Sequence, residues 1–196
     1  MTHGRNPSQQ PMRVCVYCGS SPGGDPRFVA QAHALGAALA GAGMGLVYGG
    51  GDKGLMGAVA RGTLSGGGAV LGIIPEFLLA KEQPDGADDL AGAQMRVVPD
   101  MHTRKHAMFE AADAFVALPG GIGTLEELVE MLTWAQLRRH AKPVAVLDVG
   151  GFWQPLAALL DRMEHAGFLH NAEAARPTIY DEVDALVAGL AKADQE

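Results

Sequence analysis

The amino-acid sequence predicts an α/β protein with a Rossmann-like, doubly wound and mostly parallel sheet that is covered by helices on both faces. Short apolar runs alternate along the chain with amphipathic segments of helical length, which is the pattern of β-α-β units. Glycine-rich loops follow three of these runs. Because such crossovers are right-handed and join parallel strands, the three loops are expected to meet at the carboxyl edge of one sheet.

Composition and charge limit the kind of protein. The chain has 196 residues, which suits a single domain, and a formal net charge of −7, which gives no basic surface for nucleic acid or an anionic membrane. No apolar run approaches the ~20 residues of a membrane span. We expect residues 1–12 to be a disordered leader and residues 13–196 to form the domain. The expected protein is cytoplasmic, with a small-molecule ligand and no nucleic-acid or membrane partner.

The first part of the chain alternates strand and helix. A helix begins after Asp25, a good N-terminal cap, and ends near Gly41–Gly45, where glycine suits a helix C-terminus. A second helix is expected from the loop at Gly49 through about Ser65. The strands predicted here are Arg13–Tyr17, Leu46–Tyr48 and Ala69–Ile74.

The alternation continues after an irregular stretch. Residues 75–94 carry many charged side chains with little periodicity and are predicted to form a mobile segment, of the kind that often serves as a lid or binding loop. Strands are expected at Met95–Val98, Phe115–Leu118 and Pro143–Leu147. Helices are expected at Met101–Ala112, from Thr124 onward, at Phe152–Ala166 and at Asp181–Ala193.

The loop from Pro119 to Thr124 joins a fully apolar strand to the next helix. Its three glycines allow a sharp turn and the close approach of a ligand, and the helix start offers unpaired N–H groups and the positive end of its dipole. This pattern predicts an anion site. Glu127 follows one turn into the helix, so a bound phosphate would bring its attached group close to a carboxylate. The arrangement indicates chemistry on a phosphorylated sugar.

The same residues allow a second interpretation. Thr124 and Glu127 have the spacing of a capping box, in which Thr124 caps the helix and Glu127 reaches back to its backbone N–H. A cap alone needs neither Pro119 nor three glycines. Glu127 lies on the helical wheel near Met131 and Trp134, where partial desolvation would raise its pKa. The apolar stripe of this helix lies elsewhere, at Leu125, Leu128, Val129 and Leu132.

The second glycine-rich loop also has two interpretations. Gly49, Gly51 and Gly54 spell G-x-G-x-x-G between a strand and a helix, as in dinucleotide sites, and Glu76 follows the next strand about where a ribose-binding acid would be. Alternatively, the glycines serve only tight turns and close packing of helix on strand.

Arg104 and the two cysteines each have competing explanations. Arg104 interrupts an apolar helix face, so either its stem covers the core at the surface or its guanidinium faces a carboxylate or phosphate in a cleft. Cys15 and Cys18 form a C-x-x-C pair, but they fall in or at the end of a strand, and one pair cannot complete a four-ligand zinc site. We expect core thiols, and neither a metal nor a cofactor.

Four motifs occur in a characteristic order. Residues 119–127 fit the pattern PGGxGTxxE, residues 49–57 fit GGGxxGLMG, residues 101–105 fit MHxRK, and residues 18–21 fit the first loop CGSS. Together they resemble the LONELY GUY family of cytokinin-activating phosphoribohydrolases, which are often mislabelled lysine decarboxylases. The resemblance covers Arg13 to Tyr180.

The resemblance implies hydrolysis of the N-glycosidic bond of adenosine 5′-monophosphates, both cytokinin riboside 5′-monophosphates and AMP, to a free base and ribose 5-phosphate. It implies that Arg104 and Glu127 are catalytic, and that a homodimer completes the active site at its interface, with Trp134 toward the partner. The substrate-binding residues that it implies are Gly19, Ser20, Gly50, Gly51, Met56, Glu82, Lys105, Gly120, Gly121, Ile122, Gly123, Thr124, Leu125, Glu126 and Thr133.

The physical chemistry fits this assignment and leaves some choices open. A carboxylate under the ribose stabilises the oxocarbenium-like transition state, and a phosphate held by the loop fixes the sugar over it. Arg104 either pairs with Glu127 or neutralises the phosphate, and no proton donor to the base is identified. The base that the protein prefers is also undetermined. Four apolar side chains fit a pocket for an isoprenoid group and the hydrophobic core equally well. These are Met56, Met108, Phe109 and Trp134.

Other function classes fit less well. A non-catalytic nucleotide or cofactor carrier on the same fold is the main alternative, although the presence of both Arg104 and Glu127 favours an enzyme. A short-chain oxidoreductase would need Tyr-x-x-x-Lys, and a nucleotide triphosphatase would need G-x-x-x-x-G-K-[ST]; the sequence has neither. A decarboxylase would need a Schiff-base lysine, whereas Lys105 already has a substrate-contacting interpretation.

Overall fold

The computed structural model describes residues 11–82, 90–169 and 171–194. Their strands are β1 (Arg13–Tyr17), β2 (Gly45–Tyr48), β3 (Val70–Pro75), β4 (Gln94–Val98), β5 (Ala114–Ala117), β6 (Val144–Leu147) and β7 (Thr178–Tyr180). They form one seven-stranded sheet in the order β4-β3-β2-β1-β5-β6-β7, and every strand runs parallel to its neighbours. The predicted α/β fold is confirmed.

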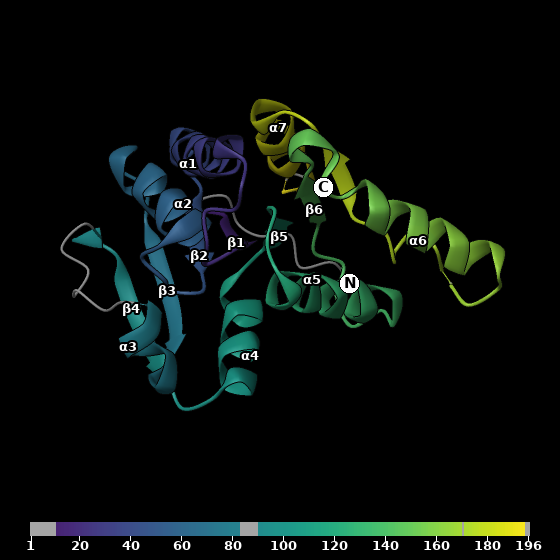
Figure 1. The fold of residues 1–196 in the computed structure, drawn as a ribbon, viewed down its shortest axis with the longest axis horizontal. Coiled ribbons are helices and arrows are strands. Elements are labelled where there is room, and N and C mark those ends of the chain that lie inside the picture. Colours follow the sequence, from purple (N-terminus) through teal and green to yellow (C-terminus); the bar gives the residue numbers. More distant parts are fainter. Residues whose placement is uncertain (1–10, 83–89, 170, 195–196) are drawn as a thin grey trace.

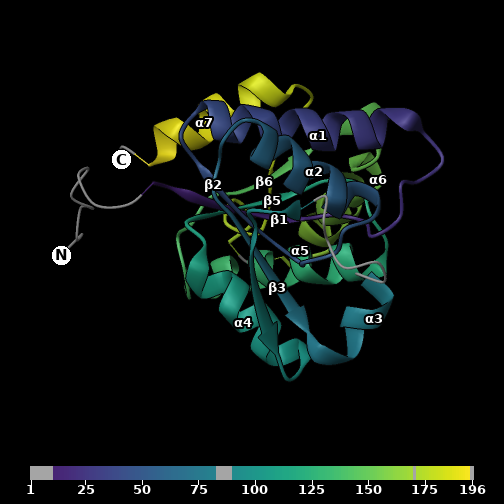
Figure 2. The ribbon, with the colours of Figure 1, turned by 90° about the vertical axis from the view of Figure 1, so that its left-hand side faces the viewer.

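Helices cover both faces of the sheet. They are α1 (Pro26–Gly41), α2 (Gly54–Ser65), α3 (Leu79–Glu82), α4 (Met101–Ala111), α5 (Ile122–Gln136), α6 (Gln154–His165) and α7 (Val183–Ala193). Helices α1, α2 and α7 lie on one face and α4 and α5 on the other (Figure 1). The view turned by 90° shows the same two layers (Figure 2). Helix α6 extends away from the body, and only Leu160 in it is buried.

The sheet separates two apolar cores. Because side chains of a strand alternate between its faces, Val14 and Val16 of β1 join the core under α1, α2 and α7, while Cys15 and Tyr17 join the core under α4 and α5. Cys15 and Cys18 are buried free thiols, as expected for core cysteines. Burial raises the pKa of both thiols.

Strands β1 and β5 lie side by side at the centre of the sheet, with Val16 opposite Val116. The chain builds the sheet outward from β1 to β4 in one direction and from β5 to β7 in the other. The helices that follow β1 and β5 therefore lie on opposite faces (Figure 1). Such a switch point leaves a crevice outside the carboxyl ends of the two strands.

Several predicted boundaries differ from the structure. Strand β7 was not predicted, because it has only three residues, includes the exposed Ile179 and carries almost no apolar pattern. The stretch 75–94, predicted to be irregular, contains a 3₁₀ turn at Glu76–Leu78 and then α3, while residues 83–89 lie outside the described residues. Helix α5 begins two residues earlier than predicted, and Val129, assigned to its apolar stripe, is exposed.

Three further expectations concern the leader, membrane spans and metal sites, and they are compared with the residues that the structure describes. Residues 1–10 lie outside them, so the leader remains a prediction, and Met12 is already buried. Within the described ranges, no helix is long and apolar enough to cross a membrane. Within the same ranges, no three His, Cys, Asp or Glu side chains are placed to hold a metal ion together.

Candidate active site

The three glycine-rich loops lie together at the carboxyl edge of the sheet, as predicted. The backbone N–H of Gly19, after β1, donates to the carbonyl oxygen of Pro119, after β5, over 3.1 Å. The carbonyl oxygen of Gly19 accepts from the backbone N–H groups of Leu55 and Met56, at the start of α2, over 3.0 and 3.3 Å. One glycine thus ties the loops together.

A cavity of 180 Å³ opens between these loops and the helices α4 and α5. It is lined by Cys18, Gly19, Ser20, Met56, Met101, Arg104, Gly121, Gly123, Thr124, Glu126 and Glu127. Both predicted catalytic residues therefore share one cavity with the first and third loops. A neighbouring cavity of 290 Å³ shares Gly19, Ser20 and Gly121 with it and also contacts Gly120. A larger cavity, of 540 Å³, is lined by none of the predicted site residues.

Glu127 is a buried carboxyl group, only 6% exposed. Burial raises its pKa to about 7. The positive charges of Arg104 and Lys105 oppose that rise, whereas the carboxylates of Glu126 and Glu130 add to it. The raised pKa that the helical wheel predicts is confirmed, and at neutral pH the carboxyl group is divided between its protonated and ionised forms.

Arg104 reaches the same cavity from α4 and is also only 6% exposed. Its Nη2 lies 3.9 Å from Oε1 of Glu127, which is too long for a hydrogen bond but close enough for electrostatic attraction. Its Nη1 contacts Sδ of Met101 at 3.8 Å, and among the described residues its Nε has no acceptor. The surface interpretation of Arg104 is wrong. A buried guanidinium with unused donors is suited to an anionic or polar ligand.

The start of α5 is open. The helix begins after Gly121, no side chain caps it, and Gly121, Ile122 and Gly123 are exposed. A Cβ atom added at Gly121 or Gly123 would meet no atom within 4 Å, so a ligand has room to approach the amides there. Thr124 lies inside the helix, with its Oγ1 packed where a side chain on Gly120 would be. The capping-box interpretation is therefore wrong.

Comparisons with known proteins show the family to which the chain belongs. The family model described as possible lysine decarboxylase matches residues 56–190. A probable cytokinin riboside 5′-monophosphate phosphoribohydrolase of Oryza sativa subsp. japonica is 49% identical over 160 residues, which are 80% of this chain and 62% of that protein. A cytokinin riboside 5′-monophosphate phosphoribohydrolase of Arabidopsis thaliana is 46% identical over 157 residues, which are 80% of this chain and 70% of that protein. The chain belongs to the LONELY GUY family.

Solved structures share the fold of this LONELY GUY protein. The Moco carrier protein of Chlamydomonas reinhardtii has a TM-score of 0.67 and 22% sequence identity, over 94% of this chain and 97% of that chain. At this identity the likeness concerns the fold alone, since one fold supports many functions.

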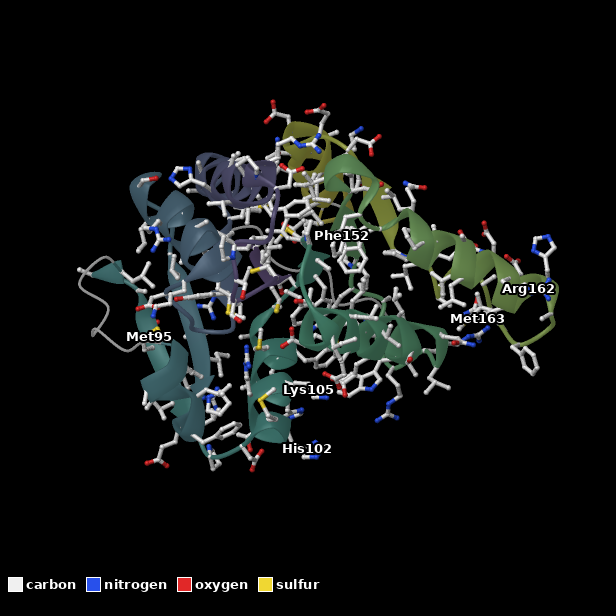
Figure 3. The ribbon with its side chains drawn as sticks, in the orientation of Figure 1. Met95, His102, Lys105, Phe152, Arg162 and Met163 are labelled. Atoms are coloured by element: carbon white, nitrogen blue, oxygen red, sulfur yellow. The ribbon has the colours of Figure 1, made fainter. Side chains whose placement is uncertain are left out.

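The MHxRK motif of the family places Lys105 beside Arg104. Its Nζ donates to Oε1 of Glu126 at 2.5 Å and of Glu130 at 3.1 Å, both on α5, and Figure 3 shows Lys105 on the side of α4 that faces α5. Partial burial disfavours its charge, but the hydrogen bonds to the two carboxylates outweigh burial and raise the pKa of Lys105. A Schiff-base lysine needs a lowered pKa, so Lys105 does not suit a decarboxylase.

Glycines of the second motif are used for packing inside the protein. Gly50 has a φ of +81°, and a Cβ there would lie 2.9 Å from Cβ of Ile74 and 3.0 Å from Cε of Met95. A Cβ on Gly54 would lie 2.5 Å from the backbone of Ser20. These contacts favour the packing interpretation over a dinucleotide site. Neither Gly50 nor Gly51 lines the cavity.

Three further predicted substrate-binding residues, all on α5, do not line the cavity. Ile122 is 81% exposed, and Leu125 is partly buried against the core. Thr133 is exposed farther along α5, with its Oγ1 donating to the carbonyl oxygen of Val129 over 2.7 Å. Glu82 ends α3, and its side chain lies outside the described residues.

Three of the four side chains considered for an isoprenoid pocket belong to the core instead. Met108 is buried, and the ring of Phe109 lies 5.0 Å from that of Trp134 in an edge-to-face contact. All three pack in the core under α4 and α5. Only Met56 lines the cavity.

The sequence analysis missed three residues at the site. Cys18 and Met101 line the cavity, and Gly49 touches Arg104. Met101 carried a usable signal, because it lies three residues before Arg104 and therefore on the same helix face. Cys18 and Gly49 lie in the motifs at residues 18–21 and 49–57, but their roles depend on contacts between loops that are distant in the sequence.

Proposed function

We propose that this protein hydrolyses the N-glycosidic bond of adenosine 5′-monophosphates, including N6-substituted cytokinin riboside 5′-monophosphates and AMP, to the free base and ribose 5-phosphate. The names of the two plant relatives support this proposal. The observation that carries it is the buried pair of Arg104 and Glu127, which lies in the same cavity as the open start of α5.

We assign the 5′-phosphate to the backbone amides at Gly121, Gly123 and Thr124. These amides belong to an uncapped helix start with no side chain in the way, where backbone donors and the helix dipole both favour an anion. Glu127 lies one turn farther on, about 5 Å along the axis. A ribose ring attached to the phosphate would thus lie over its carboxylate.

Glu127 would act in its ionised form. As the bond from C1′ to the base breaks, the bonding electron pair leaves with the base, which takes a proton from solvent. Positive charge develops on the ribose, where the carboxylate stabilises it. A water molecule then adds to C1′, and the carboxylate can accept its proton. The nonreacting phosphate holds the sugar in place for this step.

Arg104 would keep Glu127 ionised while the phosphate is bound. A phosphate near the carboxylate would raise the pKa of Glu127 further, because like charges repel. The guanidinium at 3.9 Å works against that rise, and its Nε remains available to the substrate. The same group can therefore serve both roles that the sequence left open.

We also propose that the protein works as a homodimer in the cytoplasm. Exposed apolar side chains on α5 and α6 support a partner surface, and Figure 3 shows Met163 on the part of α6 that extends from the body. Exposed Thr133 would face the partner's site. Two buried thiols outside any disulfide fit a reducing compartment. Light scattering on the wild type and on Met163→Glu tests the dimer, which the charged variant should weaken.

A product assay tests the reaction. The purified protein is given AMP or isopentenyladenosine 5′-monophosphate, with the unphosphorylated nucleosides as controls, and free base and ribose 5-phosphate are measured. Base release from the monophosphates alone is the expected result. Nucleotide binding without release would overturn the hydrolase and leave the carrier as the better explanation.

A further inference from the structure

Gly49, the residue that follows β2, lies against the guanidinium of Arg104. A Cβ atom built on Gly49 would overlap Nη2 of Arg104 and would lie 3.2 Å from its Cζ and 3.2 Å from Sδ of Met56. Gly49 has no positive φ. The φ of Gly49 therefore does not require glycine, and what requires it is the space taken by neighbouring side chains, above all by Nη2 of Arg104.

The other glycines of this loop meet different atoms. A Cβ on Gly57 would overlap the backbone carbonyl oxygen of Asp52, and one on Gly54 would collide with the backbone of Ser20. The three atoms nearest to a Cβ on Gly49 all belong to side chains. A methyl group at Gly49 would thus leave the fold in place and displace the end of Arg104.

This contact matters because Arg104 has few other restraints near its charge. The guanidinium lies 3.9 Å from Glu127 and 3.8 Å from a thioether, and neither contact is a strong hydrogen bond. Close packing against the bare backbone of Gly49 is thus a main determinant of where the charge sits.

We propose that Gly49 is a positioning residue for the hydrolysis. Because Gly49 has no side chain, it leaves a space, here called the seat, in which the Arg104 guanidinium lies beside Glu127. The proposal rests on the function proposed above for its catalytic part. It assigns the first glycine of the GGGxxGLMG motif to the arginine instead of to a phosphate. The two motifs that contain Gly49 and Arg104 then act together to position one guanidinium.

A double-mutant cycle tests the seat through activity. The wild type, Gly49→Ala, Arg104→Lys and the double variant are compared by kcat, KM and the pH dependence of kcat/KM. We expect Gly49→Ala to lower kcat/KM at least tenfold, mostly through kcat, and to displace the acid limb of the pH profile. In the Arg104→Lys background, which lacks Nη2, the same substitution should cost less than threefold. Equal losses in both backgrounds, or full activity of Gly49→Ala, would overturn the proposal.

A stability cycle separates this proposal from the proposed function. Gly49→Ala should lower the melting temperature of the wild type slightly and leave that of Arg104→Ala unchanged or higher, because the methyl group then fills vacated space. Gly41→Ala, whose Cβ would meet nothing within 4 Å, controls for adding a methyl group. If the wild type hydrolyses no nucleotide, the proposed function fails while this cycle still tests the seat. An equal fall in both backgrounds would overturn the seat even in an active enzyme.

Discussion

At the same edge of the sheet, two glycines of one glycine-rich motif face open space, whereas those of another motif pack against the protein. In the loop at residues 119–124, a Cβ on Gly121 or Gly123 would point into open space. In the motif at residues 49–57, which spans a loop and the first turn of α2, a Cβ on Gly49 or Gly57 would overlap atoms of the protein itself. The comparison teaches that a glycine motif is not by itself a phosphate site. What decides its use is whether protein or solvent occupies the space that glycine leaves.

The largest effect is expected next to the open loop. Glu127→Gln removes the charge that stabilises the developing positive ribose, so we expect kcat to fall by at least about 10²-fold. Nucleotide binding should persist, because the amides at Gly121 and Gly123 are untouched. Steady-state kinetics and calorimetric titration with the nucleotide measure the two quantities. An equal loss of kcat and of nucleotide affinity would contradict the assignment of catalysis to Glu127 and of phosphate binding to the backbone amides.

A substitution in the motif at residues 49–57, whose glycines pack against the protein, should lower the stability of the fold. Gly57→Ala forces a methyl group onto the carbonyl oxygen of Asp52, and overpacking of this kind typically costs about 1–3 kcal/mol or more. Urea denaturation measures the free energy of unfolding, with Gly41→Ala as the control that meets no atom. A Gly57→Ala variant as stable as the control would show that Gly57 does not pack against the protein.

A substitution at the open start of α5 should weaken nucleotide binding instead of the fold. Gly123→Ala adds a methyl group where no atom lies within 4 Å, and alanine suits a helix better than glycine by about 1 kcal/mol. We expect a melting temperature that is unchanged or higher, together with a KM for the nucleotide raised about tenfold, as for the loss of about one good hydrogen bond. A lower melting temperature with an unchanged KM would show that Gly123 serves packing and not ligand binding.

The smallest effect concerns the pH profile. Because Glu127 acts ionised and burial raises its pKa to about 7, kcat/KM should rise with pH through that region and then level off. Lys105 lowers the pKa of Glu127 and Glu130 raises it. Lys105→Met should therefore move the rise to higher pH, and Glu130→Gln should move it to lower pH. Shifts in the same direction would show that Lys105 acts as a substrate ligand or through the fold instead.

Local patterns were sufficient to predict most elements and the burial of Glu127. Short apolar runs placed six of the strands to within a residue or two, because strands buried on both faces need such runs, although β4 proved mostly exposed. The neighbours Met131 and Trp134 on the helical wheel predicted the desolvation of Glu127. Both features depend on residues that are close in sequence.

The features that were missed depend on contacts across the fold. The start of α5 was misplaced because Thr124 has the side chain of a good cap, whereas the structure uses its hydroxyl to pack against Gly120. The choice between pocket and core stayed open for Met108 and Phe109, because composition cannot tell a core face from a cavity face, and the structure places both in the core. The fit of Gly49 to Arg104 joins residues 55 positions apart, and no local pattern reports it.

The backbone of Gly19 has a consequence for how the protein becomes active during folding. Its two hydrogen-bonding groups join the end of β1 to Pro119 and to the start of α2, so the loops meet only after strands far apart in the sequence have paired. A nascent chain that stops before residue 114 has the first two loops but neither β5 nor Glu127. Catalytic competence should therefore appear in one step, when the central strand pair closes, and partly folded chains should have none.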